Sequence, residues 1–343
     1  MSPALILVIV IVVVALVFDF INGFHDSANS VATVVATRVL TPLQAVVWAA
    51  LFNFVSAFSF GTGVAKTVGA GMVDLSAVTV YVILCGLIGA IVWDLVTWWY
   101  GLPTSSSHAL FGGYAGAAMA RAAFEKGLQH SFEVLVWSGW IKTLVFMVVA
   151  PLIGLAAAYG FMIAVYWLFR NSSPKKMDVY FRKLQLLSAA AYSYSHGTND
   201  AQKTMGIITG VLMTTGYLKT FHVPVWVILA AHAAIALGTL SGGWRIVHTM
   251  GTRITRLRPR GGFCAESAAA TSIMLSTLVG VGVSTTHVIT GAIAGVGSIQ
   301  RAKAVRWGVA TNIVWAWALT IPASALVAWI AYSLVYSAGL DAR

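Results

Sequence analysis

The sequence predicts an all-α, polytopic membrane protein made of two inverted repeats, with broken helices, re-entrant hairpins and about 10–12 membrane segments. Three observations predict this fold class: an apolar composition, long apolar runs, and a polar motif that occurs twice. Of the 343 residues, 59% are hydrophobic and 9% are charged, whereas soluble domains carry about 25% charged residues. A water-soluble fold could not bury so much apolar surface, but a lipid bilayer can solvate it.

The apolar runs divide the first half of the chain into a series of predicted crossings. Most contain about 20 residues or more, the length that spans the hydrocarbon core of a bilayer. Two segments that carry polar motifs, around 103–120 and 284–300, form either complete crossings or re-entrant hairpins. The crossings expected before residue 170 are 4–37, 43–65, 75–100, 103–120 and 131–169.

The net charge of +11 comes from basic residues in short loops rather than from a nucleic-acid-binding surface. Such loops lie on the cytoplasmic side of a membrane by the positive-inside rule. The sequence therefore predicts a multi-pass protein of the cytoplasmic (inner) membrane, with the lipid bilayer and not nucleic acid as its partner. The basic residues form three groups: Arg170, Lys175, Lys176, Arg182 and Lys183; Arg245, Arg253, Arg256, Arg258 and Arg260; and Arg301, Lys303 and Arg306.

A polar motif occurs twice in the chain, which indicates an internal duplication. The stretch around Asp26 aligns with the stretch around Asp200, which lies 174 positions further on. A second match follows in the same order, because the hydroxyl-rich runs that end at His108 and His287 are 179 positions apart. The predicted division is a first repeat at 1–169, a basic cytoplasmic linker at 170–183 and a second repeat at 184–343.

The loop charges predict that the second repeat enters the membrane upside down. An odd number of crossings in the first repeat reverses the second copy. The loops 245–262 and 301–306 are strongly basic, whereas the corresponding first-half loops, 66–74 and 121–130, are nearly neutral. Equivalent loops are therefore expected on opposite sides, as in inverted-repeat transporters, whose substrate site lies near the midplane between the repeats.

Each copy of the motif places a glycine, a carboxylate and polar side chains within an apolar stretch. Ionisable residues in such segments are costly and are therefore candidates for function. The glycine allows the helix to break, so that freed carbonyls, together with Asp26 or Asp200, can hold a small cation or a proton. The alternative is a pair of polar contacts between helices. Lys203 is expected to pair with Asp200 or another acid, with attraction of the anion as the alternative. Structural contacts near segment ends are expected for Asp19, Asp94 and Glu266, with a role as relay groups as the alternative.

Two hydroxyl clusters are predicted to bind an anion. Each precedes a histidine, His108 or His287, and a run of small residues. If that run begins a half-helix, its amide N–H groups, hydroxyls and helix dipole suit a tetrahedral oxyanion. Ordinary N-capping by Ser or Thr is the alternative, and each histidine either donates to the anion or caps the turn. The clusters are Thr104, Ser105, Ser106 and Ser107, and Ser284, Thr285 and Thr286.

These motifs resemble those of the PiT family of inorganic phosphate transporters, over essentially the whole chain. The most specific matches are Gly23-Phe-His-Asp-Ser-Ala-Asn29, Ser195-His-Gly-Thr-Asn-Asp-Ala-Gln-Lys-Thr-Met-Gly206, and the two hydroxyl runs. The resemblance implies a secondary active symporter that imports phosphate by alternating access. It implies coupling-ion ligands at Asp26, Asn29, Asn199 and Asp200. It implies phosphate contacts at Ser105, Ser106, Ser107, Ser284, Thr285 and Thr286, with Gln202, Lys203 and Thr204 nearby.

The coupling ion is either H+ or Na+, and His25 favours H+. The run from Asn22 to Asp26 resembles the bacterial low-affinity branch, whose members resemble proton-coupled carriers of phosphate or metal–phosphate. Histidine accepts a proton near neutral pH. Sodium would instead be held by the four predicted coupling-ion ligands. No other cofactor is expected, and a homodimer is compatible with the sequence.

Three alternatives remain open from the residues alone. A sulfate permease of the same fold is the nearest, because sulfate and phosphate are both tetrahedral oxyanions. An intramembrane hydrolase would use a serine with His108 or His287, but the sequence contains no Gly-x-Ser-x-Gly nucleophile elbow and no metal motif. An anion channel with the same repeats would differ only in its flux kinetics. The sequence therefore favours a transporter over an enzyme.

Overall fold

Helices form all the regular structure in the computed structural model, which describes residues 3–58, 61–300 and 304–341. The predicted basic residues Arg301 and Lys303 lie outside the described residues. The first half contains α1 (Pro3–Ala36), α2 (Pro42–Val55), α3 (Gly63–Ala70), α4 (Val80–Tyr100), α5 (Ser106–Lys126) and α6 (Trp137–Leu168). The second half contains α7 (Pro174–Thr214), α8 (Val225–Ser241), α9 (Trp244–His248), α10 (Pro259–Leu278), α11 (Thr285–Gln300) and α12 (Trp307–Ser337). The all-α prediction is confirmed.

The two halves repeat one order of elements. Each begins with a long helix, α1 or α7, followed by a bent pair, α2–α3 or α8–α9. The bends are 88° and 63°. One more helix comes next, α4 or α10. The helix after it, α5 or α11, begins at a hydroxyl cluster. Each half ends with a long helix that contains one proline, Pro151 in α6 and Pro322 in α12.

Several helices have the length and composition of membrane spans, in agreement with the prediction of a multi-pass membrane protein. Among the described residues, four helices qualify alone, and up to six spans result if each bent pair counts as one. The four are α1, α4, α6 and α12. The polar motifs lie on α1, α5, α7 and α11, so polar side chains lower the hydropathy of several helices that lie inside the bundle.

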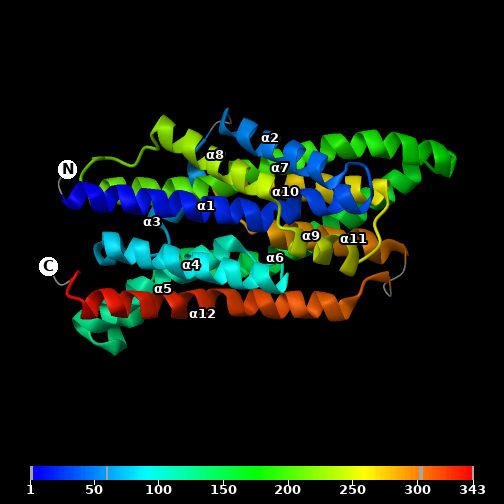
Figure 1. The fold of residues 1–343 in the computed structure, drawn as a ribbon. Helices are drawn as coiled ribbons and strands as arrows, with labels where there is room; N and C mark the ends of the chain where they lie inside the picture. The colour runs from blue at the N-terminus through cyan, green and yellow to red at the C-terminus, as the bar shows by residue number, and fades with distance from the viewer. Residues whose placement is uncertain (1–2, 59–60, 301–303, 342–343) are drawn as a thin grey trace.

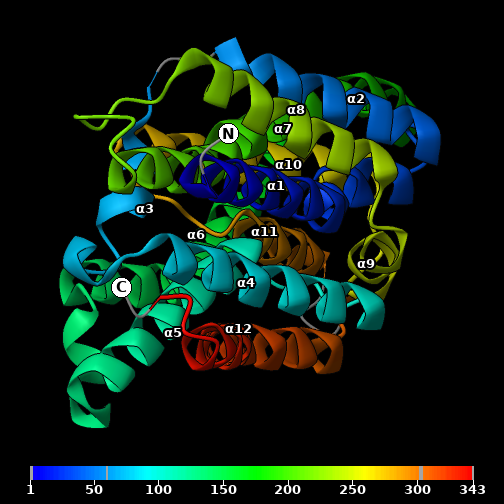
Figure 2. The same ribbon diagram turned by 60° about the vertical axis from the view of Figure 1, so that its left-hand side comes forward.

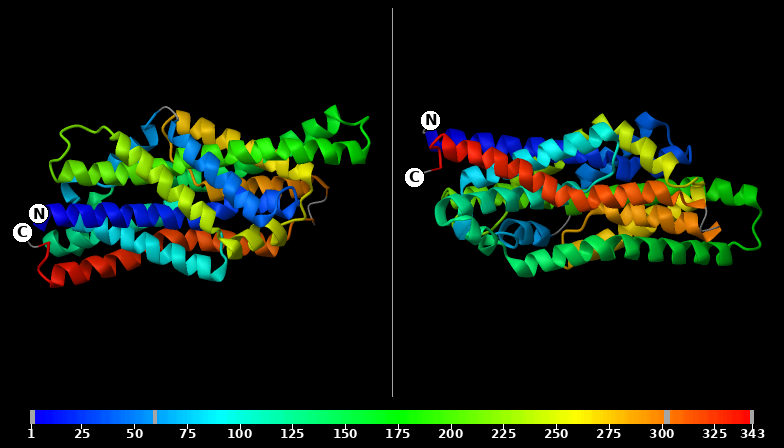
Figure 3. Two further views of the ribbon diagram at one scale, coloured as in Figure 1. Left: turned by 45° about the horizontal axis from the view of Figure 1, so that its top comes forward. Right: turned by 90° about the horizontal axis from the view of Figure 1, so that it is seen from below.

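The helices run lengthwise through the molecule, and both chain termini lie at the same end of it (Figures 1 and 2). The turn between α6 and α7 lies at the opposite end, as both further views show (Figure 3). Consequently α1 and α7 run in opposite directions. An odd number of segments before residue 170, as the sequence predicts, gives this placement of the turn.

Glycines bring helices of one half directly against helices of the other. A Cβ atom at Gly23 of α1 would lie 2.1 Å from the backbone oxygen of Ile235 in α8. A Cβ at Gly197 of α7 would lie 2.4 Å from the Ser56 hydroxyl that follows α2. The halves are therefore interlocked, because the bent pair of each lies along the first helix of the other.

The helix bounds and the burial of Asp19 correct two expectations from the sequence. The prediction that helices break at Gly23 and Gly197 is wrong, since α1 and α7 are continuous through both glycines. The breaks fall instead within the bent pairs α2–α3 and α8–α9. Asp19 was expected near a segment end, but it lies in the middle of α1 and is completely buried. Close packing, rather than backbone freedom, explains the glycines of the repeated motif.

Candidate functional site

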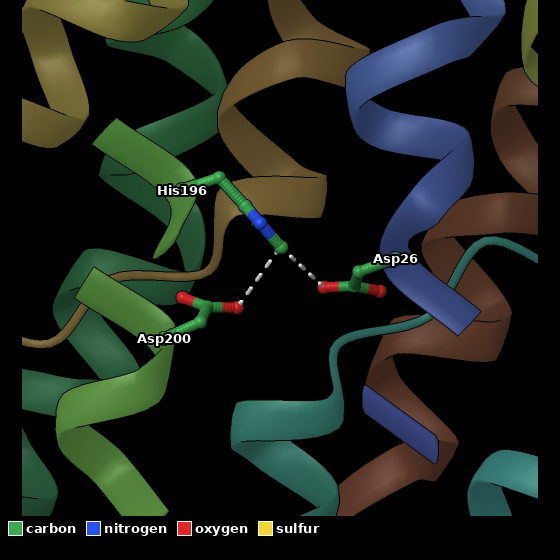
Figure 4. Close-up of side chains that lie close together, drawn as sticks. All are labelled: Asp26, His196 and Asp200. Carbon is green, nitrogen blue, oxygen red and sulfur yellow. Dashed lines mark ion pairs between the residues drawn. The ribbon is translucent and has the colours of Figure 1, made fainter. Parts of the chain in front are cut away.

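Two carboxylates from different halves face each other across a buried imidazole. Asp26 projects from α1, while Asp200 and His196 project from α7, one helical turn apart (Figure 4). The Nε2 atom of His196 lies 3.9 Å from Oδ2 of Asp26 and 3.6 Å from Oδ2 of Asp200. All three side chains are buried. The geometry brings together three potential ligand atoms, one from each side chain, within 4.8 Å of one another.

The start of α11 supplies hydroxyl groups to both carboxylates. The Thr285 hydroxyl lies 3.4 Å from Oδ2 of Asp26 and 3.3 Å from Oδ2 of Asp200. The Thr286 hydroxyl lies 3.3 Å from Oδ2 of Asp26 and accepts a hydrogen bond of 2.9 Å from the Asn29 amide. Residues of the predicted anion cluster and of the predicted cation site therefore form one site.

Lys203 connects the second aspartate to the start of α5. Its ammonium group donates to Oδ1 of Asp200 at 2.6 Å, to the backbone oxygen of Val283 at 3.0 Å, and to the Ser107 hydroxyl. The predicted pairing with Asp200 is confirmed. Because Lys203 also reaches Ser107, the single buried cation of the site touches both a carboxylate and a predicted phosphate contact.

Different hydroxyls of the two clusters have different roles. Ser105 accepts a hydrogen bond of 3.3 Å from the N–H of His108, and Ser284 accepts one of 3.2 Å from the N–H of His287. Ser105 and Ser284 are therefore ordinary helix caps. The imidazoles of His108 and His287 meet with ring centroids 4.9 Å apart. This contact brings the two helix starts, with their free N–H groups and positive dipole ends, to the same place.

Two pairs of contacts agree with the internal repeat that the sequence predicts. Asn29 and Lys203 are equivalent positions, and they bond to the equivalent residues Thr286 and Ser107. The same relation links His25 with Asn199. The His25 Nε2 lies 3.1 Å from the Thr97 hydroxyl, and the Asn199 amide donates to the Thr277 hydroxyl at 2.7 Å. Asn199 is thus turned towards α10, and no contact with either central aspartate is seen for it.

His25 occupies a position at which the two halves differ. Its Nδ1 lies 3.0 Å from Oδ1 of Asp26, and its Nε2 lies near the hydroxyls of Thr97 and Thr104. The equivalent position in the second half is an asparagine, which cannot take up a proton. The first aspartate is therefore paired with a titratable imidazole, whereas Asp200 is paired with Lys203.

Three predicted phosphate contacts lie outside this cluster. The Gln202 side-chain oxygen accepts from the backbone N–H groups of Val64 and Ala65 and so caps the start of α3. Thr204 lies beside Asp19, and Ser106 lies beside Asp94. The family resemblance implied these assignments, and neighbouring side chains on a helix point in different directions. The sequence assigned no role to His196, although its spacing of four residues from Asp200 places both on one helix face.

The other buried acids differ in their surroundings. Glu266 accepts hydrogen bonds from Thr33, Gln185 and Ser188, so the predicted structural role agrees with its contacts. Asp19 and Asp94 are also completely buried, each beside one of the motif helices.

The buried ionisable groups and the two converging helix starts, within a bundle of apolar helices, define a membrane transport protein for a small anion. Comparison with known proteins gives the family. The profile of the phosphate transporter family matches residues 22–328. The chain belongs to this family, which consists of transporters and not of enzymes.

The sequence matches individual relatives over nearly the full length of both chains. The chain is 52% identical to a probable low-affinity inorganic phosphate transporter of Rhizobium meliloti, over 92% of this chain and 93% of that protein. It is 44% identical to the protein of the same description from Bacillus subtilis, over 98% and 99%. A solved structure, described as the sodium-dependent phosphate transporter, superposes with a TM-score of 0.85 at 25% identity and covers 96% of this chain and 99% of that one.

Proposed function

We propose that the protein is a secondary active symporter that imports inorganic phosphate across the cytoplasmic membrane by alternating access. The substrate would bind between Asp26 and Asp200 and the starts of α5 and α11. The coupling cation is H+ in the first instance, with Na+ as the second candidate. The family membership supports the substrate, and the arrangement of buried charges supports the coupling.

The single observation that carries the proposal is the charge of the site. Asp26 and Asp200 contribute two negative charges, and Lys203 contributes one positive charge when the histidines are neutral. These groups are shielded from water, where an uncompensated charge is costly. An anion that enters adds further negative charge, so it can bind only together with one or more cations. This requirement supports coupled transport.

The residues divide into two sets of roles. Asp26 and Asp200 would hold the coupling cation, with Asn29 orienting the Thr286 hydroxyl beside them. Asn199, also predicted as a ligand, donates to the Thr277 hydroxyl of α10. The anion would be bound by Lys203, by hydroxyls, and by free N–H groups at two helix starts. The hydroxyls proposed to contact phosphate are those of Ser107, Thr285 and Thr286, while Ser105 and Ser284 hold the helix starts in place.

Protons and sodium each have a supporting observation. His25 and His196 flank the first carboxylate, and imidazole can change its charge near neutral pH. This arrangement favours H+. In favour of Na+, the oxygen atoms of two carboxylates and two threonines lie close together, and hard cations prefer oxygen ligands. The name of the solved relative, a sodium-dependent phosphate transporter, favours sodium as well.

The proposal extends to the architecture and to the form of the substrate. The repeated order of elements and the opposite directions of α1 and α7 support two inverted repeats, 1–169 and 184–343, joined by the linker 170–183. Phosphate that retains a proton can donate a hydrogen bond to Asp26 or Asp200, which sulfate at neutral pH cannot do. Transport as a metal–phosphate complex and assembly as a homodimer stay predictions.

Uptake of radiolabelled phosphate into proteoliposomes tests the proposal. A pH gradient and a sodium gradient are imposed separately, with and without excess unlabelled sulfate, and protein-free liposomes serve as the control. Accumulation driven by the pH gradient and unaffected by sulfate is the expected result. A requirement for sodium would identify Na+ as the coupling cation. Flux that never exceeds equilibrium under either gradient would contradict symport and indicate a channel, and inhibition by sulfate would contradict selectivity for phosphate.

A further inference from the structure

A second basic site lies away from the aspartates, in a cavity of about 350 Å³. The cavity is lined by α6, the π-helical turn η4 (Thr249–Arg253), the start of α10 and the end of α11, and it is partly open. Its volume falls within the range of roughly 300–1,000 Å³ that is usual for small-molecule sites. We call it the arginine cavity, after the basic side chains that line it: Arg256, Arg258, Arg260 and Arg306.

The positive charge of the arginine cavity is not balanced by the protein. Among the described residues, none of its four guanidinium groups forms an ion pair, and no acidic residue lines the cavity. Arg260 lies over the ring of Tyr166, 4.8 Å from its centroid, and its buried Nε has no hydrogen-bond partner. Four like charges at close range repel one another, so an anion between them would lower the energy of the site.

The backbone adds donors to these side chains. The helix α10 has 20 residues and begins at this cavity, and no side chain caps its first N–H groups. Gly261, in the first turn of α10, lines the cavity. A helix start combines free N–H groups with the positive end of the helix dipole, and arginine forms paired hydrogen bonds with phosphate oxygens.

The orientation of the protein in the membrane does not by itself explain this arrangement. Basic residues that set membrane orientation need only lie in a loop near the ends of the helices. Here arginines from the loop before α10, from the first turn of α10 and from the loop before α12 line one partly open cavity together with Thr255 and Gly297. Arg256, Arg258 and Arg306 are exposed, and Arg260 is half-buried. Convergence on a cavity is expected of a binding site and is not required by the positive-inside rule.

We propose that the arginine cavity binds a phosphate-bearing anion, either free inorganic phosphate or the headgroup of an anionic phospholipid. The site is separate from the one between Asp26 and Asp200. Thr285 contacts both aspartates, and Gly297 lines the cavity. The two residues lie towards opposite ends of α11, about 18 Å apart along its axis. The proposal therefore goes beyond transport and does not depend on the coupling mechanism.

Protection of arginines from phenylglyoxal, mapped by peptide mass spectrometry on the full-length protein, tests the proposal. The reagent is selective for arginine, so binding near Lys203 leaves the readout unchanged. One arm adds inorganic phosphate in detergent. A second compares nanodiscs of phosphatidylglycerol with nanodiscs of phosphatidylcholine. The exposed Arg170, outside the cavity, serves as the internal control in every sample.

The expected result is slower modification of the cavity arginines with unchanged modification of Arg170. Protection by phosphate would identify free phosphate as the ligand, and protection only by phosphatidylglycerol would identify a lipid headgroup. The double variant Arg256→Gln/Arg306→Gln should weaken the protection of Arg258 and Arg260 roughly tenfold or more, since bonds to charged groups contribute strongly. The variant Lys175→Gln/Lys176→Gln, with the same loss of charge on exposed residues of α7, should not.

Two outcomes would overturn the proposal. The first is that neither ligand slows the modification of the cavity arginines relative to that of Arg170. The second is that both double variants weaken protection equally. The second result would indicate general attraction of anions to a basic surface. Because no gradient or flux is measured, these outcomes are distinct from a failure of the symport proposal.

Discussion

At the scale of single residues, the pairing of Asp200 with Lys203 gives the most direct test of the site. The two groups are 2.6 Å apart and buried, and breaking a buried ion pair usually costs several kcal/mol. Asparagine at position 200 would keep an oxygen that accepts from Lys203 but would lose the negative charge. The variant therefore separates the requirement for charge from the requirement for a folded site.

We expect Asp200→Asn to abolish coupled phosphate uptake while the protein still reaches the membrane. The cation would lose one of its two carboxylates, and Lys203 would lose its counter-charge. Uptake into proteoliposomes and the amount of protein in the membrane are measured together. Asp178→Asn, an exposed position on the same helix, is the matched control. Unchanged uptake by the position-200 variant would show that this carboxylate is structural.

The hydroxyls of Thr285 and Thr286 permit a second prediction at the residue scale. Replacing both by valine keeps the side-chain shape and removes two hydrogen-bonding groups of the site. Each such bond contributes about 0.5–1.5 kcal/mol, so the concentration of phosphate at half-maximal uptake should rise roughly tenfold. Thr290→Val is the control, because Thr290 is buried on the same helix and its hydroxyl has no partner. Equal losses of affinity and of folded protein in the double variant would indicate a folding role.

At the scale of elements, close glycine contacts hold the helices of the two halves together. Gly23 allows α1 to approach Ile235 of α8, and Gly291 allows α11 to approach the backbone oxygen of Pro151 in α6, 2.0 Å from a Cβ at that position. In membranes, helices associate through such small residues because lipid is as apolar as the helix surface. The same helices carry the site, so the contacts also determine how Asp26 and Thr285 meet.

We expect Gly23→Ala to destabilise the protein, because the added methyl group would overlap backbone atoms of α8. Overpacking of this kind costs about 1–3 kcal/mol, and it should lower the temperature at which the detergent-solubilised protein loses its single peak in size-exclusion chromatography. Gly210→Ala on α7 is the control, since nothing lies within 4 Å of a Cβ there. Alanine is the better helix former by about 1 kcal/mol, so the control should be unchanged or more stable.

At the scale of the whole molecule, the two termini lie at one end and the α6–α7 turn at the other. The basic loops predict that the end with the turn faces the cytoplasm. The arginine cavity is formed by the second of these basic loops and by the loop at Arg306. Membrane orientation and the position of the second anion site are therefore linked.

Cysteine labelling tests this orientation. Ser172→Cys lies in the turn between α6 and α7, and Ser337→Cys lies at the end of α12; both positions are exposed. A membrane-impermeant maleimide should label position 172 only in inside-out vesicles and position 337 only in right-side-out vesicles. The native Cys85 and Cys264 are buried, so the unmodified protein serves as the unlabelled control. Labelling of both positions from one side would contradict an odd number of crossings per half.

The sequence alone determined the class of the protein and much of its plan. Composition and the apolar runs predicted a helical membrane protein, because a chain with so few charges has no soluble alternative. The two copies of the aspartate motif and of the hydroxyl cluster predicted the duplication and most of the residues that meet at the site. Asp26, Asp200, Thr285, Thr286 and Ser107 belong to this set. These inferences depend on residue types and on spacing, which are properties of the chain itself.

Only the tertiary structure decided which of these residues meet. Thr285 lies 259 positions from Asp26 in sequence yet within 3.4 Å of it, and no local pattern encodes that contact. For the same reason Gln202 turned out to cap α3, Gly23 and Gly197 to pack helices rather than break them, and His196 to lie between the aspartates. A helix sends neighbouring side chains in different directions. The partner of each is therefore set by how the two halves interlock.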